Sequence, residues 1–331
     1  MDNGTLNRRE FLKTSAQMAG IMAFGGLISQ QAFAETAKGF KMESLTLNNG
    51  VQMPMLGLGV LNIKDLKECQ RVVEDALEVG YRLFDTAQSY GNEAGVSAAI
   101  KATGIKREEI FVTTKLFKDY ATEDKAKAAF DESCKKLQVD YVDLFLIHQP
   151  INDLYGAWRA MSSLYKQKRI RAIGVCNFYA DRLVDFCMNN EIIPAVNQCA
   201  CNPFRQELEL QKQCEEYHVA YEAFSPFAQG KNGIFSNKTL QGIAEKHNKS
   251  VAQVILCWLI ERKIIAIPKT TQKERMRENL NIFDFRLDSH DKAQIASLET
   301  GNVGLNHRDP AVIKWLNERK NGESLATSGK K

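Results

Sequence analysis

A carboxylate and a phenol stand five residues apart, directly after an apolar run. Asp85 and Tyr90 lie in the segment Phe-Asp-Thr-Ala-Gln-Ser-Tyr-Gly-Asn-Glu, residues 84–93, and a helical pattern follows it. A phenol is a weak acid, with a reference pKa of about 10. It becomes a useful proton donor when a buried cation and a carboxylate adjust its pKa. The pair therefore indicates general acid chemistry, provided that the fold supplies a cation.

Two further apolar runs end on residues that could complete such a site. Lys115 ends Val-Thr-Thr-Lys, and His148 ends Leu-Phe-Leu-Ile-His. A structural ion pair between Lys115 and Asp85, and a core histidine at position 148, are the alternative interpretations. Four such groups at the ends of three apolar runs favour a catalytic site.

These residues need elements that bring the ends of strands together. Continuous apolar runs that alternate with helical patterns predict a parallel sheet covered by helices. The strand-like runs are 55–60, 82–86, 110–116, 142–147, 170–175, 195–199, 219–225 and 264–268. The predicted helices are 66–79, 93–102, 123–137, 154–165, 180–188, 206–217, the long stretch 238–261, and 275–281.

The number of units favours a closed barrel. Eight strand–helix units in about 230 residues match the (β/α)8 TIM barrel, and a doubly wound sheet is the alternative. No Gly-x-Gly-x-x-Gly follows the first run, which argues against a Rossmann fold. Asn49-Gly50 predicts an N-terminal β-hairpin. The carboxyl ends of barrel strands share one mouth, so the four polar side chains should meet there.

The two ends of the chain differ from the barrel pattern. We divide the chain into a signal peptide (1–34), a linker (35–41), the barrel (42–316) and a flexible tail (317–331). The tail belongs to a C-terminal loop and helix extension, and the chain from Gly301 onward reads as loop-like and partly disordered.

The first 34 residues resemble a twin-arginine signal peptide. Arg8 and Arg9 begin Arg-Arg-Glu-Phe-Leu-Lys, an uncharged glycine-containing stretch follows, and Ala-Phe-Ala at 32–34 resembles a signal peptidase site. We therefore predict export to the periplasm by the twin-arginine translocation machinery, with no stable membrane association after processing. A chance amphipathic N-terminus or a disordered tail, on a cytoplasmic protein, is the alternative.

Composition is that of an ordinary globular protein. The 331 residues are 44% hydrophobic and 25% charged, and the formal net charge is +4. No basic block indicates a nucleic-acid partner. Eight cysteines invite a disulfide interpretation, but their positions in predicted helices and strands favour small core side chains. Cys199 and Cys201 form the only close pair, which is weak support for zinc, and no metal site is predicted.

Six motifs in a fixed order carry a resemblance to a known family. The motifs are Gly-Tyr-Arg-Leu-Phe-Asp-Thr-Ala-Gln-Ser-Tyr-Gly-Asn-Glu (80–93), Thr-Thr-Lys-Leu (113–116), Asp-Tyr-Val-Asp-Leu-Phe-Leu-Ile-His (140–148), Ile-Gly-Val-Cys-Asn-Phe (173–178), Val-Asn-Gln (196–198) and Ile-Pro-Lys-Thr (267–270) with Arg275 and Asn279. On these motifs the chain, from residue 42 to residue 315, resembles an aldo-keto reductase, and in particular the compact bacterial members similar to diketo-gluconate reductases.

The resemblance implies an NADPH-dependent reduction of an aldehyde or ketone. It implies that Tyr90 protonates the carbonyl oxygen and that Lys115, paired with Asp85, lowers the pKa of the phenol. It also implies that His148 orients the carbonyl. Hydride addition creates an oxyanion, which a nearby donor stabilises.

The same resemblance implies a set of cofactor contacts. Asn177 and Gln198 would bind the nicotinamide carboxamide, and Phe224 would stack on its ring. The remaining expected contacts are Ser225 at the pyrophosphate, Lys269, Thr270 and Arg275 at the 2′-phosphate, and Glu278 with Asn279 at the adenine. Cations around a dianion favour NADPH over NADH.

Departures from the family pattern fall in the expected substrate pocket. Leu61 and Gln149 stand where aromatic residues are usual, whereas Phe117 keeps its aromatic ring, and Cys176 stands where serine is usual. A more polar pocket favours a small polar carbonyl compound or a keto-sugar. A non-catalytic NADP(H)-binding accessory or redox-sensing subunit on the same barrel is the alternative function. A divalent-metal hydrolase is a third, weaker interpretation.

Overall fold

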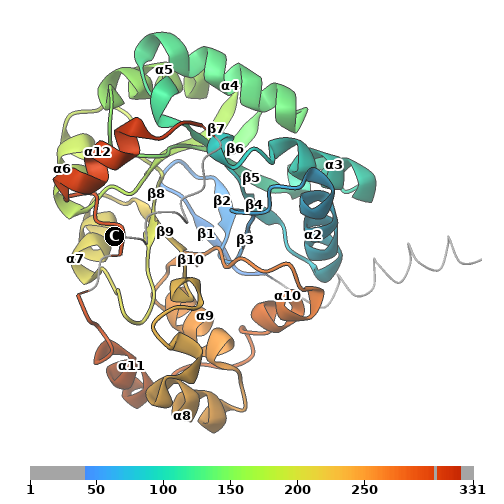
Figure 1. Ribbon diagram of the computed structural model, residues 1–331, viewed down its shortest axis with the longest axis vertical. Helices are drawn as coiled ribbons and strands as arrows, with labels where there is room; N and C mark the ends of the chain where they lie inside the picture. The colour runs from blue at the N-terminus through green and yellow to red at the C-terminus, as the bar shows by residue number, and fades with distance from the viewer. Residues whose placement is uncertain (1–41, 302–303, 322–331) are drawn as a thin grey trace, which may run out of the picture. The chain divides into compact units, whose positions relative to one another are not determined.

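Eight parallel strands form the centre of the computed structural model, which describes residues 42–301 and 304–321 (Figure 1). The predicted signal peptide and linker therefore lie outside the described residues. The strands are β3 (Leu58–Gly59), β4 (Leu83–Asp85), β5 (Phe111–Leu116), β6 (Val142–Ile147), β7 (Ile170–Cys176), β8 (Val196–Ala200), β9 (Ala220–Phe224) and β10 (Ile265–Ala266). They pair in chain order, and a parallel bridge between Leu56 and Ala266 joins the two ends of the sheet. The predicted (β/α)8 barrel is confirmed.

The strands form where the apolar runs predicted them. All residues of β5, β6 and β8 are buried, as expected for strands covered on both faces. Close approach of β7 to β8 depends on Gly174, where an added Cβ would lie 2.4 Å from the carbonyl oxygen of Val196. This contact helps to align the carboxyl ends of the two strands.

Helices cover the barrel on the outside (Figure 1). They are α2 (Leu66–Val79), α3 (Glu93–Thr103), α4 (Glu123–Leu137), α5 (Leu154–Lys166), α6 (Ala180–Met188), α7 (Leu208–Glu216), α8 (Lys238–His247), α9 (Val251–Glu261) and α10 (Lys273–Leu280). The stretch 238–261, predicted as one helical region, is two helices. Asn248 ends α8 in the left-handed conformation, and Ser250 begins α9 through a capping box with Gln253.

Elements at each end of the described chain complete the barrel. The predicted N-terminal hairpin is present as β1 (Ser44–Thr46) paired with β2 (Gln52–Pro54). The chain also forms α11 (Ser289–Ala296) and α12 (Pro310–Glu318). The loop-like expectation from Gly301 onward is therefore wrong for α12. Asp309 caps this helix and Pro310 opens it, a start signal that was present in the sequence.

All eight cysteines lie in the hydrophobic core, unpaired and buried, which confirms their predicted packing role. The described residues contain no group of three or more His, Cys, Asp or Glu placed to hold a metal ion. No helix in the described ranges has both the length and the apolar composition that a membrane span requires.

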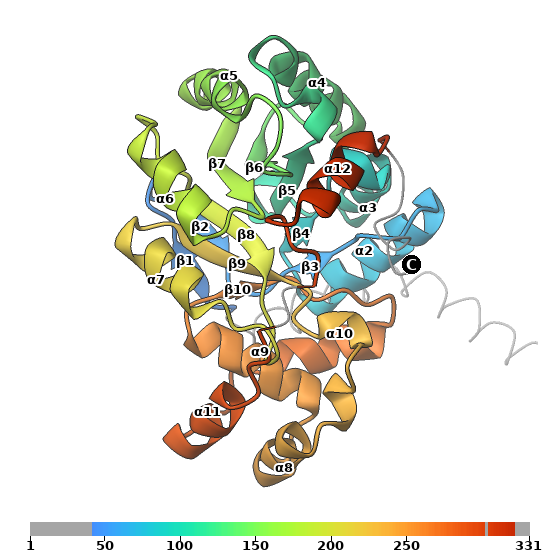
Figure 2. The ribbon, with the colours of Figure 1, turned by 60° about the vertical axis from the view of Figure 1, so that its left-hand side comes forward.

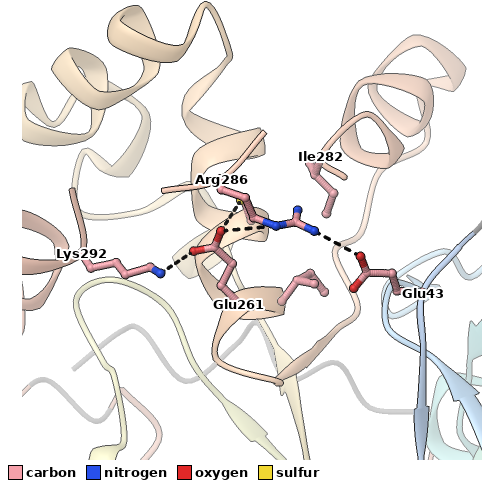
Figure 3. Close-up of a pocket in the computed structure, with 7 residues that line it drawn as sticks. Glu43, Glu261, Ile282, Arg286 and Lys292 are labelled. Atoms are coloured by element: carbon pink, nitrogen blue, oxygen red, sulfur yellow. Dashed lines mark hydrogen bonds and ion pairs between the residues drawn. The ribbon is translucent and has the colours of Figure 1, made fainter. Parts of the chain in front are cut away.

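A cavity of about 370 Å³ lies at the amino-terminal end of the barrel. Figure 3 shows the residues that line it, which are Glu43, Cys257, Ile260, Glu261, Ile282, Arg286 and Lys292. The charges in it pair with one another: Lys292 lies 2.9 Å from Glu261, and Arg286 lies 3.4 Å from Glu43. Glu261 ends α9, just before β10 begins, so this cavity is at the opposite end from the mouth.

Candidate active site

The four predicted catalytic side chains meet at the carboxyl ends of three neighbouring strands. Asp85 ends β4, Lys115 lies near the end of β5, His148 follows β6, and Tyr90 ends the short helix η1 (Gln88–Tyr90). Lys115 Nζ donates to Asp85 Oδ1 at 2.6 Å and to Oδ2 at 2.7 Å. The same ammonium lies 3.3 Å from the Tyr90 hydroxyl. The structure therefore links carboxylate, ammonium and phenol in one chain of contacts.

The segment that carries Tyr90 is held by buried polar contacts. Asn92 donates to the carbonyls of Val60 and Ile63 at 2.9 Å each, and it accepts from Thr86 at 2.7 Å. Gly91 takes a φ of 72°, which ends η1 and favours glycine. The phenol is thus fixed at the rim of the mouth by the conformation of residues 86–92.

Burial and charge act in opposite directions on this group. Burial raises the pKa of Tyr90, and the positive charge of Lys115 acts against that rise without cancelling it. Lys115 thus lowers the phenol pKa, as the resemblance implies, but desolvation outweighs the ammonium and the net shift is upward. For Lys115 burial alone would lower the pKa, but the Asp85 carboxylate reverses this and the net shift is upward. At neutral pH both groups carry protons.

His148 is neutral at neutral pH. Burial, followed by the positive charges of Lys115 and Arg319, lowers the pKa of this imidazole well below its usual value. Its Nδ1 lies 3.4 Å from the Ser89 hydroxyl, and its ring meets the Tyr90 ring edge-on with centroids 5.8 Å apart. If Ser89 donates to Nδ1, the ring proton sits on Nε2, which has no hydrogen-bond partner within the described residues. Ser89 was not among the predicted site residues.

Comparison with known proteins agrees with this geometry. The sequence profile of the Aldo/keto reductase family matches residues 55–300. The chain belongs to this family. It is 43% identical over 257 residues to the glyoxal reductase of Bacillus subtilis (strain 168). The matched region covers 77% of the chain and 92% of that protein. It is 41% identical to methylglyoxal reductase DkgA of Yersinia pestis, over 78% of the chain and 93% of that relative.

A solved structure extends the comparison to the fold and the cofactor. The structure of the Bombyx mori aldo-keto reductase in complex with NADP matches this chain with a TM-score of 0.77 and 33% identity. The match covers 86% of this chain and 99% of the Bombyx mori chain. Aldo-keto reductases use NADPH, and the chain is an NADP-dependent oxidoreductase that reduces carbonyl compounds.

The residues predicted to hold the nicotinamide end lie on three neighbouring strand ends of the aldo-keto reductase barrel. Asn177 follows β7, Gln198 lies in β8, and Phe224 ends β9. Asn177 and Ser225 have positive φ values of 66° and 51°, which bend the chain sharply at the mouth. Phe224 is half-buried, so one part of its ring remains available for stacking.

The residues predicted to hold the adenosine end lie just before α10 and along that helix. Thr270 and Asn279 are buried, Glu278 is half-buried, and Lys269 and Arg275 are exposed. Neither of these two cations forms an ion pair within the described residues, whereas the nearby Lys273 pairs with Glu78. Two cations without an ion-pair partner among the described residues, Lys269 and Arg275, lie near the hydroxyl of Thr270, and such a set is suited to binding a phosphate dianion. The donor set of the structure is thus suited to NADPH.

The predicted substrate-pocket residues follow three strands at the same mouth. Leu61 comes after β3, Phe117 after β5 and Gln149 after β6. Gln149 Oε1 lies 2.8 Å from Nε2 of His307, a residue that precedes α12. Figure 2 shows helix α12. This helix is tied to the same side, because Lys118 Nζ donates to the Asn317 carbonyl at 3.0 Å. His307 was not predicted, since nothing in its local sequence indicates which strand end it reaches.

The free energy of unfolding is expected to fall as the pH drops from about 6.5 to about 4. Burial, with Arg205, lowers the pKa of His307 to about 4, and the pKa of His148 is also lowered. Below pH 6.5 the unfolded chain binds protons that the folded chain does not, so this stability is present above 6.5 and is lost on acidification.

Denaturant unfolding at pH 7 and pH 4.5 measures the effect. His307→Gln should shrink the difference between the two pH values by up to about 2 kcal/mol, because Gln has no proton to gain. An undiminished difference in this variant would contradict the assignment to His307.

Proposed function

We propose that the protein reduces small polar carbonyl compounds, including keto-sugars, with Tyr90 as the general acid. The observation that carries the proposal is the contact of one buried ammonium with both the Asp85 carboxylate and the Tyr90 hydroxyl. A positive charge beside the phenol favours the phenolate that forms when the proton leaves. Asp85 holds that charge in place, since Lys115 is fully buried and would otherwise lack a counter-ion.

Two side chains can then donate hydrogen bonds to one substrate oxygen. In the tautomer that accepts from Ser89 at Nδ1, His148 carries a proton on Nε2 and can donate to the same carbonyl oxygen as Tyr90, whose ring it meets edge-on. Bound NADPH supplies the hydride that adds to the carbonyl carbon. As negative charge grows on the oxygen, Tyr90 gives its proton to it, and the neutral His148 keeps its hydrogen bond. Lys115 stabilises the resulting phenolate until solvent restores the proton.

The polar character of the mouth supports a small polar substrate. Gln149 and His307 present two polar groups, an amide and an imidazole, and Leu61 offers only an aliphatic side chain. Relatives described as glyoxal and methylglyoxal reductases act on small carbonyl compounds of this kind. A steady-state screen of purified protein with methylglyoxal, a diketo-gluconate and benzaldehyde tests the proposal. Higher kcat/KM for benzaldehyde than for both polar compounds would contradict it.

Removing a cation at the adenosine end should weaken NADPH binding and leave NADH binding unchanged. We expect Arg275→Ala to raise the Kd of NADPH by about tenfold or more, the loss of one charge-assisted contact to phosphate. NADH lacks the 2′-phosphate, so its Kd should not change. Fluorescence titration measures both constants, and Arg277→Ala, two residues along the same helix, is the matched control. If Arg275→Ala raised the Kd of NADPH and the Kd of NADH equally, the assignment of Arg275 to the 2′-phosphate would be wrong.

A non-catalytic NADP(H)-binding accessory or redox-sensing role is the second candidate. It would retain cofactor binding and need no proton donor at the mouth. Normal NADPH affinity with no turnover on any carbonyl in the screen would favour it over catalysis.

We also propose export by the twin-arginine route, on the basis of the sequence pattern at residues 1–34. Replacing Arg8 and Arg9 by lysine should hold the full-length precursor inside the cell, and fractionation with immunoblotting measures its location. Mature-size protein still found outside the cytoplasm would contradict this.

A further inference from the structure

Gln198 lies between two buried carboxylates. Across the β8–β9 pair its partner in the strand register is Glu222. Gln198 Nε2 donates to Asp85 Oδ2 at 2.7 Å and to Glu222 Oε2 at 2.8 Å. All three residues are at most 2% exposed, so water does not compete for these contacts. Glu222 is the one acid in the otherwise non-acidic strand Ala220–Phe224, and it was not a predicted site residue.

These contacts decide which end of the amide faces the carboxylates. An amide nitrogen carries two hydrogens, and the two carboxyl groups accept both of them. The reverse orientation would place the oxygen of Gln198 against carboxylate oxygens. Oε1 therefore faces away, toward the Cys176 thiol at 3.7 Å, which is a weak donor. The oxygen keeps capacity to accept a stronger hydrogen bond.

Among the residues that the structure describes, no cation forms an ion pair with Glu222. Lys115 Nζ donates to both oxygens of Asp85 and to the Thr86 carbonyl. Within the described residues, Glu222 Oε1 has no hydrogen-bond partner. Burial, reinforced by the negative charge of Asp85, raises the pKa of Glu222. Its Oε2 accepts from Gln198, and a glutamine at position 222 would offer a carbonyl oxygen that can accept in the same place.

We propose that Glu222 is a positioning residue for the cofactor: it holds the Gln198 amide so that Oε1 accepts from the N–H of the nicotinamide carboxamide. The inference rests on the proposed function in one respect, the placement of Gln198 at the carboxamide. Without Glu222, a single carboxylate holds the amide nitrogen, and the side chain can turn its oxygen away from the nicotinamide. Glu222 itself touches neither cofactor nor substrate.

A pair of cofactors tests this without any need for turnover. In the 3-acetylpyridine analogue of NADP a methyl group replaces the carboxamide nitrogen, so it cannot donate to Oε1. Isothermal titration calorimetry should show that the wild-type protein binds NADP about two- to tenfold more tightly than the analogue, the value of one hydrogen bond. Glu222→Met should bring this ratio close to one. Glu222→Gln should keep the wild-type ratio, because its side-chain oxygen accepts in the same place.

The outcomes separate the inference from the proposed function. Loss of the ratio in Gln198→Ala, with the wild-type ratio kept in Glu222→Met, would overturn the inference alone. An unchanged ratio in Gln198→Ala would overturn the cofactor assignment and the inference with it. Loss of the ratio in Glu222→Gln would also contradict the inference. Glu222→Leu is a second apolar variant if circular dichroism shows that the methionine variant does not fold.

Discussion

Replacing Tyr90 with phenylalanine is expected to lower kcat for carbonyl reduction by about 10²- to 10⁴-fold, the usual contribution of a general acid. The ring and its edge-on contact with His148 remain, so only the hydroxyl near Lys115 is lost. NADPH affinity should be unchanged, since none of the predicted cofactor contacts involves this phenol. Loss of NADPH absorbance with methylglyoxal measures turnover, and fluorescence titration measures binding.

A second tyrosine provides the matched control. Tyr155 lies on α5, and its hydroxyl bonds Asp185 at the surface rather than any residue of the mouth. Tyr155→Phe should therefore retain wild-type turnover. If Tyr90→Phe turned over at the wild-type rate, the proton would have to come from another group, and the general acid assignment would be wrong.

Replacing Lys115 with methionine is expected to cost about 3–5 kcal/mol of unfolding free energy, because it leaves a buried carboxylate without its cation. Lys115 is fully buried and Asp85 is 2% exposed, so solvent cannot take over the role of the ammonium. Turnover should fall as well, since the phenolate of Tyr90 would lose its nearest positive charge. Urea unfolding and the NADPH assay measure the two effects on the same preparation.

A double variant separates stability from catalysis. Adding Asp85→Asn to Lys115→Met removes the unpaired charge, so a large part of the lost stability should return. Turnover should stay low, because the ammonium is still absent. Recovery of turnover together with stability would show that the pair has only a structural role.

The barrel and its four central side chains could be predicted because they depend on local pattern. Each strand appears as a continuous apolar run, and in a parallel barrel the carboxyl ends of such runs meet. Asp85, Lys115 and His148 therefore come together as soon as the strand order is known. The helix boundaries of α2 and α4 likewise follow from periodicity within one segment.

What could not be predicted depends on contacts between distant segments. His307 reaches Gln149 across 158 positions of the chain, and no local pattern specifies that contact. The register that places Glu222 beside Gln198 is also set by the pairing of two strands. The sign of the Tyr90 pKa shift depends on how fully the fold buries the phenol, since desolvation and Lys115 oppose each other.

The barrel is closed by a narrow seam. At this point the two-residue strands β3 and β10 meet through three backbone hydrogen bonds, from Gly57 and Gly59 to the carbonyls of Ala266 and Pro268 and from Ala266 to Met55. Local opening of the closed sheet should begin at this short ladder, because few hydrogen bonds hold it. Amide hydrogen exchange should therefore be fastest here among the barrel strands. Lys269, a predicted contact of the 2′-phosphate, directly follows these residues in the chain. Bound NADPH would therefore hold this part of the barrel closed and slow its local opening.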